Sequence, residues 1–317
     1  MFDRQPAYYT CKVLQMLSCL GLALAILITA NLFWLQILNA AFLAFVFTQI
    51  AFIGHDAGHR QIFQSSRKTA AFGLLCTLLT AISFSWWTKK HTQHHSHPNH
   101  LERDPDVRLR FVAFSDEQTC RMQGWHRTIV KHQARLIIPM LLLQGIAIRV
   151  HSFKYLLSTR ARVAVLESLL MAIHVFLYLG VVFSLLGMWK GITFILVHQL
   201  LFGLYMGSVF ATNHKGMLVL KGDNTLDRLR QQVLTARNVR AHPLTDFWFG
   251  GLNYQIEHHL FPQMARNKLK GAQATVRAFC QARSIPYCET SVVQAYREIL
   301  RYLHHVSAPL RHAGNGQ

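Results

Sequence analysis

Long apolar runs separated by basic segments are the main pattern along this chain. Residues 13–30 and 35–54 are apolar and uncharged, and each comes close to the roughly 20 apolar residues that a membrane-spanning helix needs. Only a short break separates them, so they predict a helical hairpin. The turn carries no Lys or Arg, whereas Lys12 and Arg60 flank the outer ends. The positive-inside rule therefore predicts that both outer ends lie in the cytoplasm.

A second pair of long apolar runs, residues 163–187 and 192–212, predicts another hairpin. Its connection has a single basic residue, Lys190. Four spans in two hairpins would return the chain to the cytoplasm near residue 213. Residues 213–317 hold no further spanning run and carry an excess of Lys and Arg, so we predict a cytosolic helical cap there.

Two further apolar runs, residues 70–87 and 136–150, are at the short end for a span. If residues 70–87 crossed the membrane, the histidine-rich segments before and after them would face opposite sides and could not share a site. We therefore predict that both runs are interfacial or re-entrant, with Trp86 and Trp87 at headgroup level. The fold class that follows is an all-α integral membrane protein with a single domain over residues 1–317.

The composition supports a membrane protein and argues against a nucleic-acid-binding one. Hydrophobic residues make up 51% of the chain, and the net charge is +19. A nucleic-acid binder can be as basic, but apolar runs of this length are foreign to that class. Cytoplasmic loops that face anionic membrane lipid account for the charge instead. We expect no nucleic-acid partner and no cleaved signal peptide, because the first apolar run lacks a small-residue cleavage site.

Histidines cluster in three segments, HDAGH (55–59), HTQHH (91–95) and QIEHH (255–259). On a helix, residues three and four apart share a face, so each segment presents its imidazoles on one side. The predicted topology brings the end of the fourth span, with one more histidine, to the same depth. Neutral imidazole suits iron, zinc and copper. The candidate metal ligands are therefore His55, His59, His91, His94, His95, His214, His258 and His259.

Polar residues near these histidines are candidates for hydrogen bonds that hold the rings. Gln255 is also a candidate for a weak ligand, directly or through a water. Asn213 has the same possible role, or it simply ends the preceding helix. Each carboxylate is equally well explained as a solvated or helix-capping residue. The carboxylate candidates are Asp56, Asp104, Asp106 and Glu257.

The number of imidazoles favours two metal ions. A catalytic zinc site normally uses three protein ligands and an open position, so eight histidines are too many for one zinc. Two metals with four to five ligands each would use all eight. The carboxylate-rich di-iron bundles use Glu-x-x-His pairs, which this sequence lacks. His198 lies roughly 24 Å before His214 along a helix, which excludes it from the site; it would line an acyl channel or tie helices together.

At this point the sequence resembles the membrane fatty acid desaturases. The resemblance rests on the three boxes, on SHPNHLERDPDV (96–107), NHKG (213–216) and GGLNYQIEHHLFP (250–262), and it covers roughly residues 35–275. The Gln that opens the third box is typical of the acyl-lipid/linoleoyl-CoA-type branch, which shares it with front-end desaturases. The resemblance to this family implies four membrane helices under a cytosolic cap, two Fe ions, and O₂ as co-substrate. It also implies an enzyme that inserts a cis double bond into an acyl chain.

The same resemblance assigns the metal-binding positions to the seven box histidines and to His214, with Gln255 as the family's Gln. A hydroxylase or ketolase acting on a lipid, an alkane or a carotenoid would share such a site, because hydrogen abstraction can end in oxygen transfer instead. A membrane metal transporter would need ligands at mid-membrane, whereas the boxes lie outside the predicted spans. The QIEHH box and the DPDV segment favour desaturation.

The expected substrate is acyl-CoA, acyl-ACP or an acyl-lipid. Basic residues are candidates for binding its headgroup, or they follow only from the positive-inside rule. Fused cytochrome b5 domains carry a His-Pro-Gly-Gly motif that this sequence lacks, so we expect a separate electron donor: a ferredoxin, cytochrome b5 or reductase. That pattern predicts a bacterial cell membrane, with the active site on the cytoplasmic side. The headgroup candidates are Lys89, Lys90, Arg237, Arg240 and Arg266.

Overall fold

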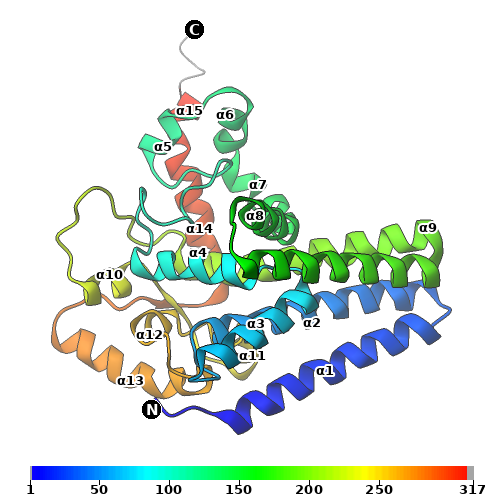
Figure 1. The fold of residues 1–317 in the computed structure, drawn as a ribbon. Helices are drawn as coiled ribbons and strands as arrows, with labels where there is room; N and C mark the ends of the chain where they lie inside the picture. The colour runs from blue at the N-terminus through cyan, green and yellow to red at the C-terminus, as the bar shows by residue number, and fades with distance from the viewer. Residues whose placement is uncertain (1, 313–317) are drawn as a thin grey trace.

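The structure, a computed structural model, describes residues 2–312 and is almost entirely helical (Figure 1). Three helices, α1 (Pro6–Thr29), α2 (Phe33–Gly58) and α9 (Arg162–His214), are long and apolar enough to cross a membrane. Two bent helix pairs raise the number of candidate spans to as many as five. The long helices run side by side, and the shorter helices gather at one end of them (Figure 1). The last residues of the predicted cap, 313–317, lie outside the described part of the chain.

Helices α1 and α2 form the first predicted pair, but both extend beyond the apolar runs. Helix α1 begins at Pro6 instead of residue 13, because proline is preorganised for the first helical position and a hydropathy pattern misses polar first turns. Helix α2 continues past residue 54 to Gly58. The side chain of Gln36 donates to the carbonyls of Leu27 and Ala30, so it satisfies groups that the end of α1 leaves unpaired.

Helix α9 is not one straight rod. Gly187 has φ 71° and ψ 179° and interrupts the helix. The hydroxyl of Tyr178 lies 2.7 Å from Nδ1 of His198, although twenty residues of straight helix would separate them by about 30 Å. The chain therefore folds back on itself, and the two arms lie together (Figure 1). The predicted connection at residues 188–191 is wrong in detail, because a single glycine with positive φ makes the turn.

The two short apolar runs each belong to a bent pair of helices. Helices α3 (Ser66–Thr80) and α4 (Phe84–Ser96) meet at 108°, and α7 (Gln133–Leu142) and α8 (Gln144–Ser158) meet at 70°. The boundaries predicted at residues 70–87 and 136–150 are therefore wrong, since each run crosses a break between two helices. Such a bend is the geometry of a broken span or a re-entrant segment.

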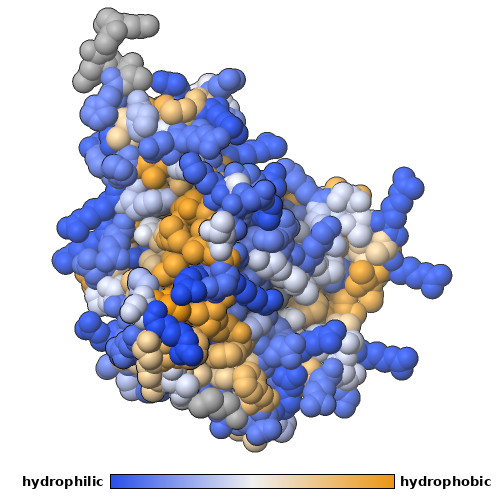
Figure 2. All heavy atoms as spheres, turned by 90° about the vertical axis from the view of Figure 1, so that its left-hand side faces the viewer, coloured by the Kyte–Doolittle hydropathy of each residue, from blue (hydrophilic) through white to orange (hydrophobic). Residues whose placement is uncertain are grey.

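Short helices and loops form the cap. Its only regular strands in residues 2–312, β1 (Asn238–Val239) and β2 (Glu289–Thr290), pair in parallel and are a minor exception to the all-α prediction. Viewed from the side where α10, α12 and α13 lie, hydrophilic residues surround a hydrophobic strip (Figure 2). The helices of the predicted cap are α10 (Arg228–Leu234), α11 (Pro243–Trp248), α12 (Gln255–Leu260), α13 (Arg266–Ala282), α14 (Val292–Val306) and α15 (Ala308–His312). Two helices from earlier in the chain, α5 (Asp116–Cys120) and α6 (Gly124–Lys131), pack against α15.

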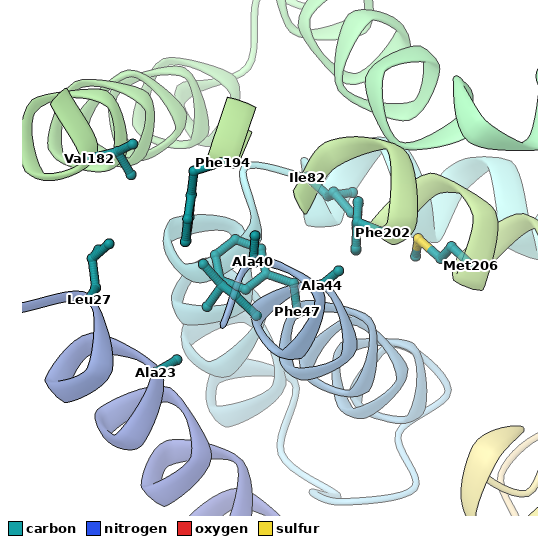
Figure 3. Close-up of a cluster of buried hydrophobic side chains, with 11 residues drawn as sticks. Ala23, Leu27, Ala40, Ala44, Phe47, Ile82, Val182, Phe194, Phe202 and Met206 are labelled. Carbon is teal, nitrogen blue, oxygen red and sulfur yellow. The ribbon is translucent and has the colours of Figure 1, made fainter. Parts of the chain in front are cut away.

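A buried apolar cluster joins α1, α2 and both arms of α9 (Figure 3). Outside this core, many leucine, valine and phenylalanine side chains of α1 and α9 are exposed, which fits a surface that contacts lipid. Trp34 and Trp189, beside the two hairpin turns, are 78% and 81% exposed, and tryptophans favour membrane–water interfaces. The labelled members of the cluster are Ala23, Leu27, Ala40, Ala44, Phe47, Ile82, Val182, Phe194, Phe202 and Met206.

The close approach of α8 to α9 makes a testable prediction. A Cβ added at Gly203 would lie 2.8 Å from the backbone nitrogen of Gly145 and 3.0 Å from the carbonyl oxygen of Leu141. Gly203→Ala should therefore force the helices apart and lower the free energy of unfolding by about 1–3 kcal/mol. Gly180→Ala is the matched control, since nothing lies within 4 Å of its added Cβ. Equal thermal midpoints for the two variants in detergent would contradict this packing.

Candidate metal centre

Four segments deliver the eight predicted histidines to one place. His55 and His59 come from the end of α2, three histidines from α4, His214 from the last turn of α9, and two from α12. Seven of the eight side chains are buried and His59 is half-buried. The predicted exclusion of His198 agrees with the geometry, because its ring contacts Tyr178 and Phe47 instead.

The imidazoles form two adjacent groups. The first has four members and the second three, and within each group the nitrogen atoms lie within 4.8 Å of one another. His95 lies between them, with its ring centre 4.6 Å from that of His59 and 4.1 Å from that of His259. The first group is His55, His59, His91 and His258, and the second is His94, His214 and His259.

Several ring nitrogens in these groups are buried without a hydrogen-bond partner among the described residues. They include Nε2 of His59, Nε2 of His259 and both nitrogens of His258. The Nε2 atom of His91 lies 3.1 Å from Nε2 of His55 and equally close to Nε2 of His95. An unsatisfied buried polar group costs about 1–3 kcal/mol, and a metal cation would satisfy several facing lone pairs at once. The donor set therefore fits metal ions that prefer imidazole, iron among them.

Hydrogen bonds on the far side of the rings point Nε2 toward the centre. Nδ1 of His55 lies 3.1 Å from the carboxylate of Asp56, and Nδ1 of His94 lies 2.9 Å from that of Asp104. Two further acceptors come from the cap: Oε1 of Gln232 for His259 at 2.8 Å, and the carbonyl of Thr235 for His214 at 3.0 Å. Sequence reasoning missed both, since neither has a characteristic spacing from a histidine box.

Of the other polar candidates, Gln255 and Asn213 lie beside an imidazole of the second group, and Glu257 does not. Nε2 of Gln255 lies 3.0 Å from Nε2 of His214, and Asn213 donates to Oε1 of Gln255, so both belong to the second group's surroundings. Glu257 instead accepts hydrogen bonds from Asn238 and Tyr287. Within residues 2–312 it receives none from an imidazole, so its observed contacts join α12 to the segments that carry Asn238 and Tyr287.

Two of the candidate headgroup residues are buried in ion pairs. Arg266 pairs with Asp56, and Arg237 pairs with Glu298 and donates to the carbonyl of Thr212. Both are therefore closed to a headgroup at the surface. Lys90 pairs with the carboxylate of Asp106. Lys89 and Arg240 remain exposed.

An apolar cavity adjoins the first imidazole group. It lies between α2, the α3–α4 bend and the second arm of α9, and has a volume of about 30 Å³. His55 is its only histidine. The lining residues are Ala51, Gly54, His55, Cys76, Thr80, Ile82, Phe84, Trp87, Met206 and Phe210.

Comparison with known proteins agrees with this site. The sequence profile described as Fatty acid desaturase matches residues 32–291. The chain belongs to the fatty acid desaturase family, a family of O₂-dependent oxidoreductases, and the resemblance noted from its motifs is confirmed.

Curated relatives are similar at low identity. They include an acyl-lipid (9-3)-desaturase of Physcomitrium patens, 26% identical over 97% of this chain and 60% of the relative. A Delta(8)-fatty-acid desaturase of Arabidopsis thaliana is 25% identical over 94% of this chain and 71% of the relative. A Delta(5) fatty acid desaturase of Caenorhabditis elegans is 27% identical over 90% of this chain and 66% of the relative. The chain spans less than two thirds of the length of several of these relatives.

The electrostatics of the site predict how the metal-free protein responds to pH. Burial lowers the pKa of His59 to about 3 and holds the pKa values of His258 and His259 well below their usual range. The unfolded chain, with imidazole pKa values near about 6.5, therefore binds more protons than the folded one below that pH. The contribution of these neutral imidazoles to the free energy of unfolding is therefore fully present above about pH 6.5, and it is lost as the pH falls below that value.

We therefore expect the thermal midpoint of the metal-free protein to drop by several degrees between pH 7.5 and 5.5. His259→Gln should reduce this pH dependence, whereas His304→Gln, at an exposed imidazole, should leave it unchanged. Midpoints that do not vary with pH would contradict the burial of neutral rings.

Proposed function

We propose that this protein is a di-iron, O₂-dependent fatty acyl desaturase that introduces a cis double bond into a membrane-associated acyl chain. The observation that carries the proposal is the pair of adjacent imidazole groups, beside which an apolar cavity reaches His55. A desaturase needs a redox-active metal pair beside apolar, water-poor surroundings, and the lining of this cavity supplies such surroundings at His55. At about 30 Å³ the cavity has the volume of one water molecule, so entry of an acyl chain requires the lining side chains to move apart. Family membership supports the same conclusion.

In this proposal His55, His59, His91 and His258 hold one iron ion, and His94, His214 and His259 hold the other. His95 is close enough to both groups to complete either. Bound iron would supply the redox and O₂ chemistry that removes two hydrogens from an unactivated carbon chain. The protein's own part is to keep the rings neutral and oriented: Asp56, Asp104 and Gln232 hold Nδ1 atoms so that Nε2 faces the centre.

The proposed membrane arrangement has four spans in two hairpins: α1 with α2, and the two arms of α9. The bent pairs α3–α4 and α7–α8 then remain on the cytoplasmic side as re-entrant or interfacial segments. Support comes from the histidines themselves, because α4 carries its three to the same end of α2 and α9 where the others lie. The cap, which on one face has hydrophilic residues around a hydrophobic strip (Figure 2), would face the cytosol.

The proposed substrate is the acyl group of a membrane lipid. Two of the similar proteins are named acyl-lipid (9-3)-desaturases, and the cavity adjoins helices long enough to span a bilayer. The exposed basic residues Lys89 and Arg240 are the remaining headgroup candidates. Electrons would come from a separate donor such as a ferredoxin, cytochrome b5 or reductase.

The direct test is the fatty acid profile of a host that expresses the chain. The parent should produce a new unsaturated fatty acid, with the double bond located by mass spectrometry. His94→Ala should reduce that product at least 100-fold, since it removes a proposed ligand of one metal and leaves the membrane helices unchanged. His304→Ala is the control at an exposed histidine, and it should match the parent.

Two outcomes would contradict the proposal. Wild-type product levels in His94→Ala would remove that residue from the site. A hydroxylated or keto product from the parent would replace desaturation by the alternative oxygen-transfer chemistry on the same site.

A further inference from the structure

The bend between α3 and α4 breaks a helix in apolar surroundings. Ala81 has φ 53° and ends α3 in the left-handed conformation, and α4 begins three residues later. Every helix end leaves backbone groups without intrahelical partners, and in a low-dielectric environment such groups need other partners. The bend therefore has to be supported by side chains from elsewhere.

An arginine supports the α3 side of the bend. Nε of Arg149, on α8, donates to the carbonyl oxygen of Thr80 at 3.0 Å, and its Nη1 donates to Oε1 of Gln199 at 2.7 Å. A positive charge is favourable at the C-terminal end of a helix dipole. Arg149 thus links the end of α3 to α8 and α9.

A glutamate supports the α4 side. The backbone N–H of Ser85 donates to Oε1 of Glu167 at 3.0 Å, and the Ser85 hydroxyl donates to Oε2 at 2.8 Å. The hydroxyl of Ser83 also donates to this carboxylate. Glu167 comes from the first arm of α9, is fully buried, and forms no ion pair within residues 2–312. Its position at the N-terminus of α4 is favourable for a negative charge.

Together these contacts satisfy the first four amides of the α4 entry. Ser83 N–H donates to Ser152 Oγ, Phe84 N–H to Thr77 Oγ1, Ser85 N–H to Glu167 and Trp86 N–H to Ser83 Oγ. Because α4 bears three of the eight histidines within about 15 Å of this entry, a tilt at Ser85 would move all three relative to those on α2, α9 and α12.

Tight packing of aromatic side chains on α4 also fixes the orientation of this helix and of its histidine rings. The ring of Trp87 stacks on that of His91 with centres 4.5 Å apart, and it lies where a Cβ on Gly58 would be. Phe84 likewise fills the space beside Gly73. With its entry held and two aromatic side chains fitted against glycines, α4 has little freedom to rotate.

We propose that Glu167 is a positioning residue of the metal centre, which fixes the N-terminus of α4 and thereby aligns His91, His94 and His95 with the imidazoles of the other segments. This inference rests on the proposed ligand assignment. It assigns a role to a carboxylate that lies outside every histidine box and contacts none of the rings.

The test is a Co(II) titration of the metal-free, detergent-solubilised full chain, followed by visible absorption. Glu167→Ala should weaken Co(II) binding by about 10- to 100-fold, the range typical for groups that orient metal ligands. Glu167→Gln can still accept from the Ser85 amide, so its affinity should lie between those of the parent and the alanine variant.

Asn39→Ala is the matched control for stability. Asn39 is also buried in a candidate span, but its side chain donates to the carbonyl of Ala23 on α1 at 2.9 Å. It should lower the thermal midpoint and leave Co(II) affinity at the parent value.

Parent-like Co(II) affinity in Glu167→Ala would overturn the inference, and so would an equal loss of affinity in Asn39→Ala, which would make the effect one of global stability. If Glu167→Ala does not fold, Glu167→Gln and Ser85→Ala carry the test: weaker binding in both supports the inference, and parent affinity in both overturns it. Absence of Co(II) binding by the parent would instead overturn the proposed ligand assignment, and the inference with it.

Discussion

The rest of this structure depends on one constraint: uncharged imidazole nitrogens are buried close together, with their lone pairs facing one another. Placing such atoms together without water costs free energy for every unpaired nitrogen, and protonation is disfavoured because burial lowers the pKa values of His59, His258 and His259. Only a partner that accepts several nitrogen lone pairs at once removes that cost. The site is therefore suited to metal ions, and the surrounding fold holds the rings in place.

The fold meets this demand by bringing helix ends together. Helices α2 and α9 finish at the same level, and their last turns carry His55 and His214. The bend after α3 turns α4 so that its histidines meet the others, instead of continuing away from them. Cap residues then supply acceptors for the far side of the rings, as Gln232 and Thr235 do. Membrane-type helices thus provide rigid supports, and the polar cap provides orientation.

Much of this architecture could be predicted from the sequence because its signals are local. Apolar runs identify α1, α2 and the two arms of α9, and the spacing of His91, His94 and His95 places them on one helical face. The helix boundaries were less accurate. The start at Pro6, the turn at Gly187 and the breaks within the two shorter runs depend on capping and backbone conformation, to which hydropathy is insensitive.

Roles that depend on tertiary contact could not be predicted. Arg237 and Arg266 look like surface charges in the sequence, but their burial and their pairing with Glu298 and Asp56 follow only from the folded cap. Glu167 interrupts an apolar run as a single carboxylate, and nothing in its spacing connects it with Ser83 or Ser85. These residues support the site across long sequence separations, so a sequence motif does not reveal them.

The proposed function depends on one metal ion in each of the two imidazole groups. The most direct measurement is iron content per chain together with X-ray absorption at the iron edge of the purified protein. We expect two iron ions per chain, with nitrogen as the main neighbouring atom of each iron and no sulfur neighbour. A single iron per chain, or carboxylate oxygen as the main neighbouring atom, would contradict the proposal.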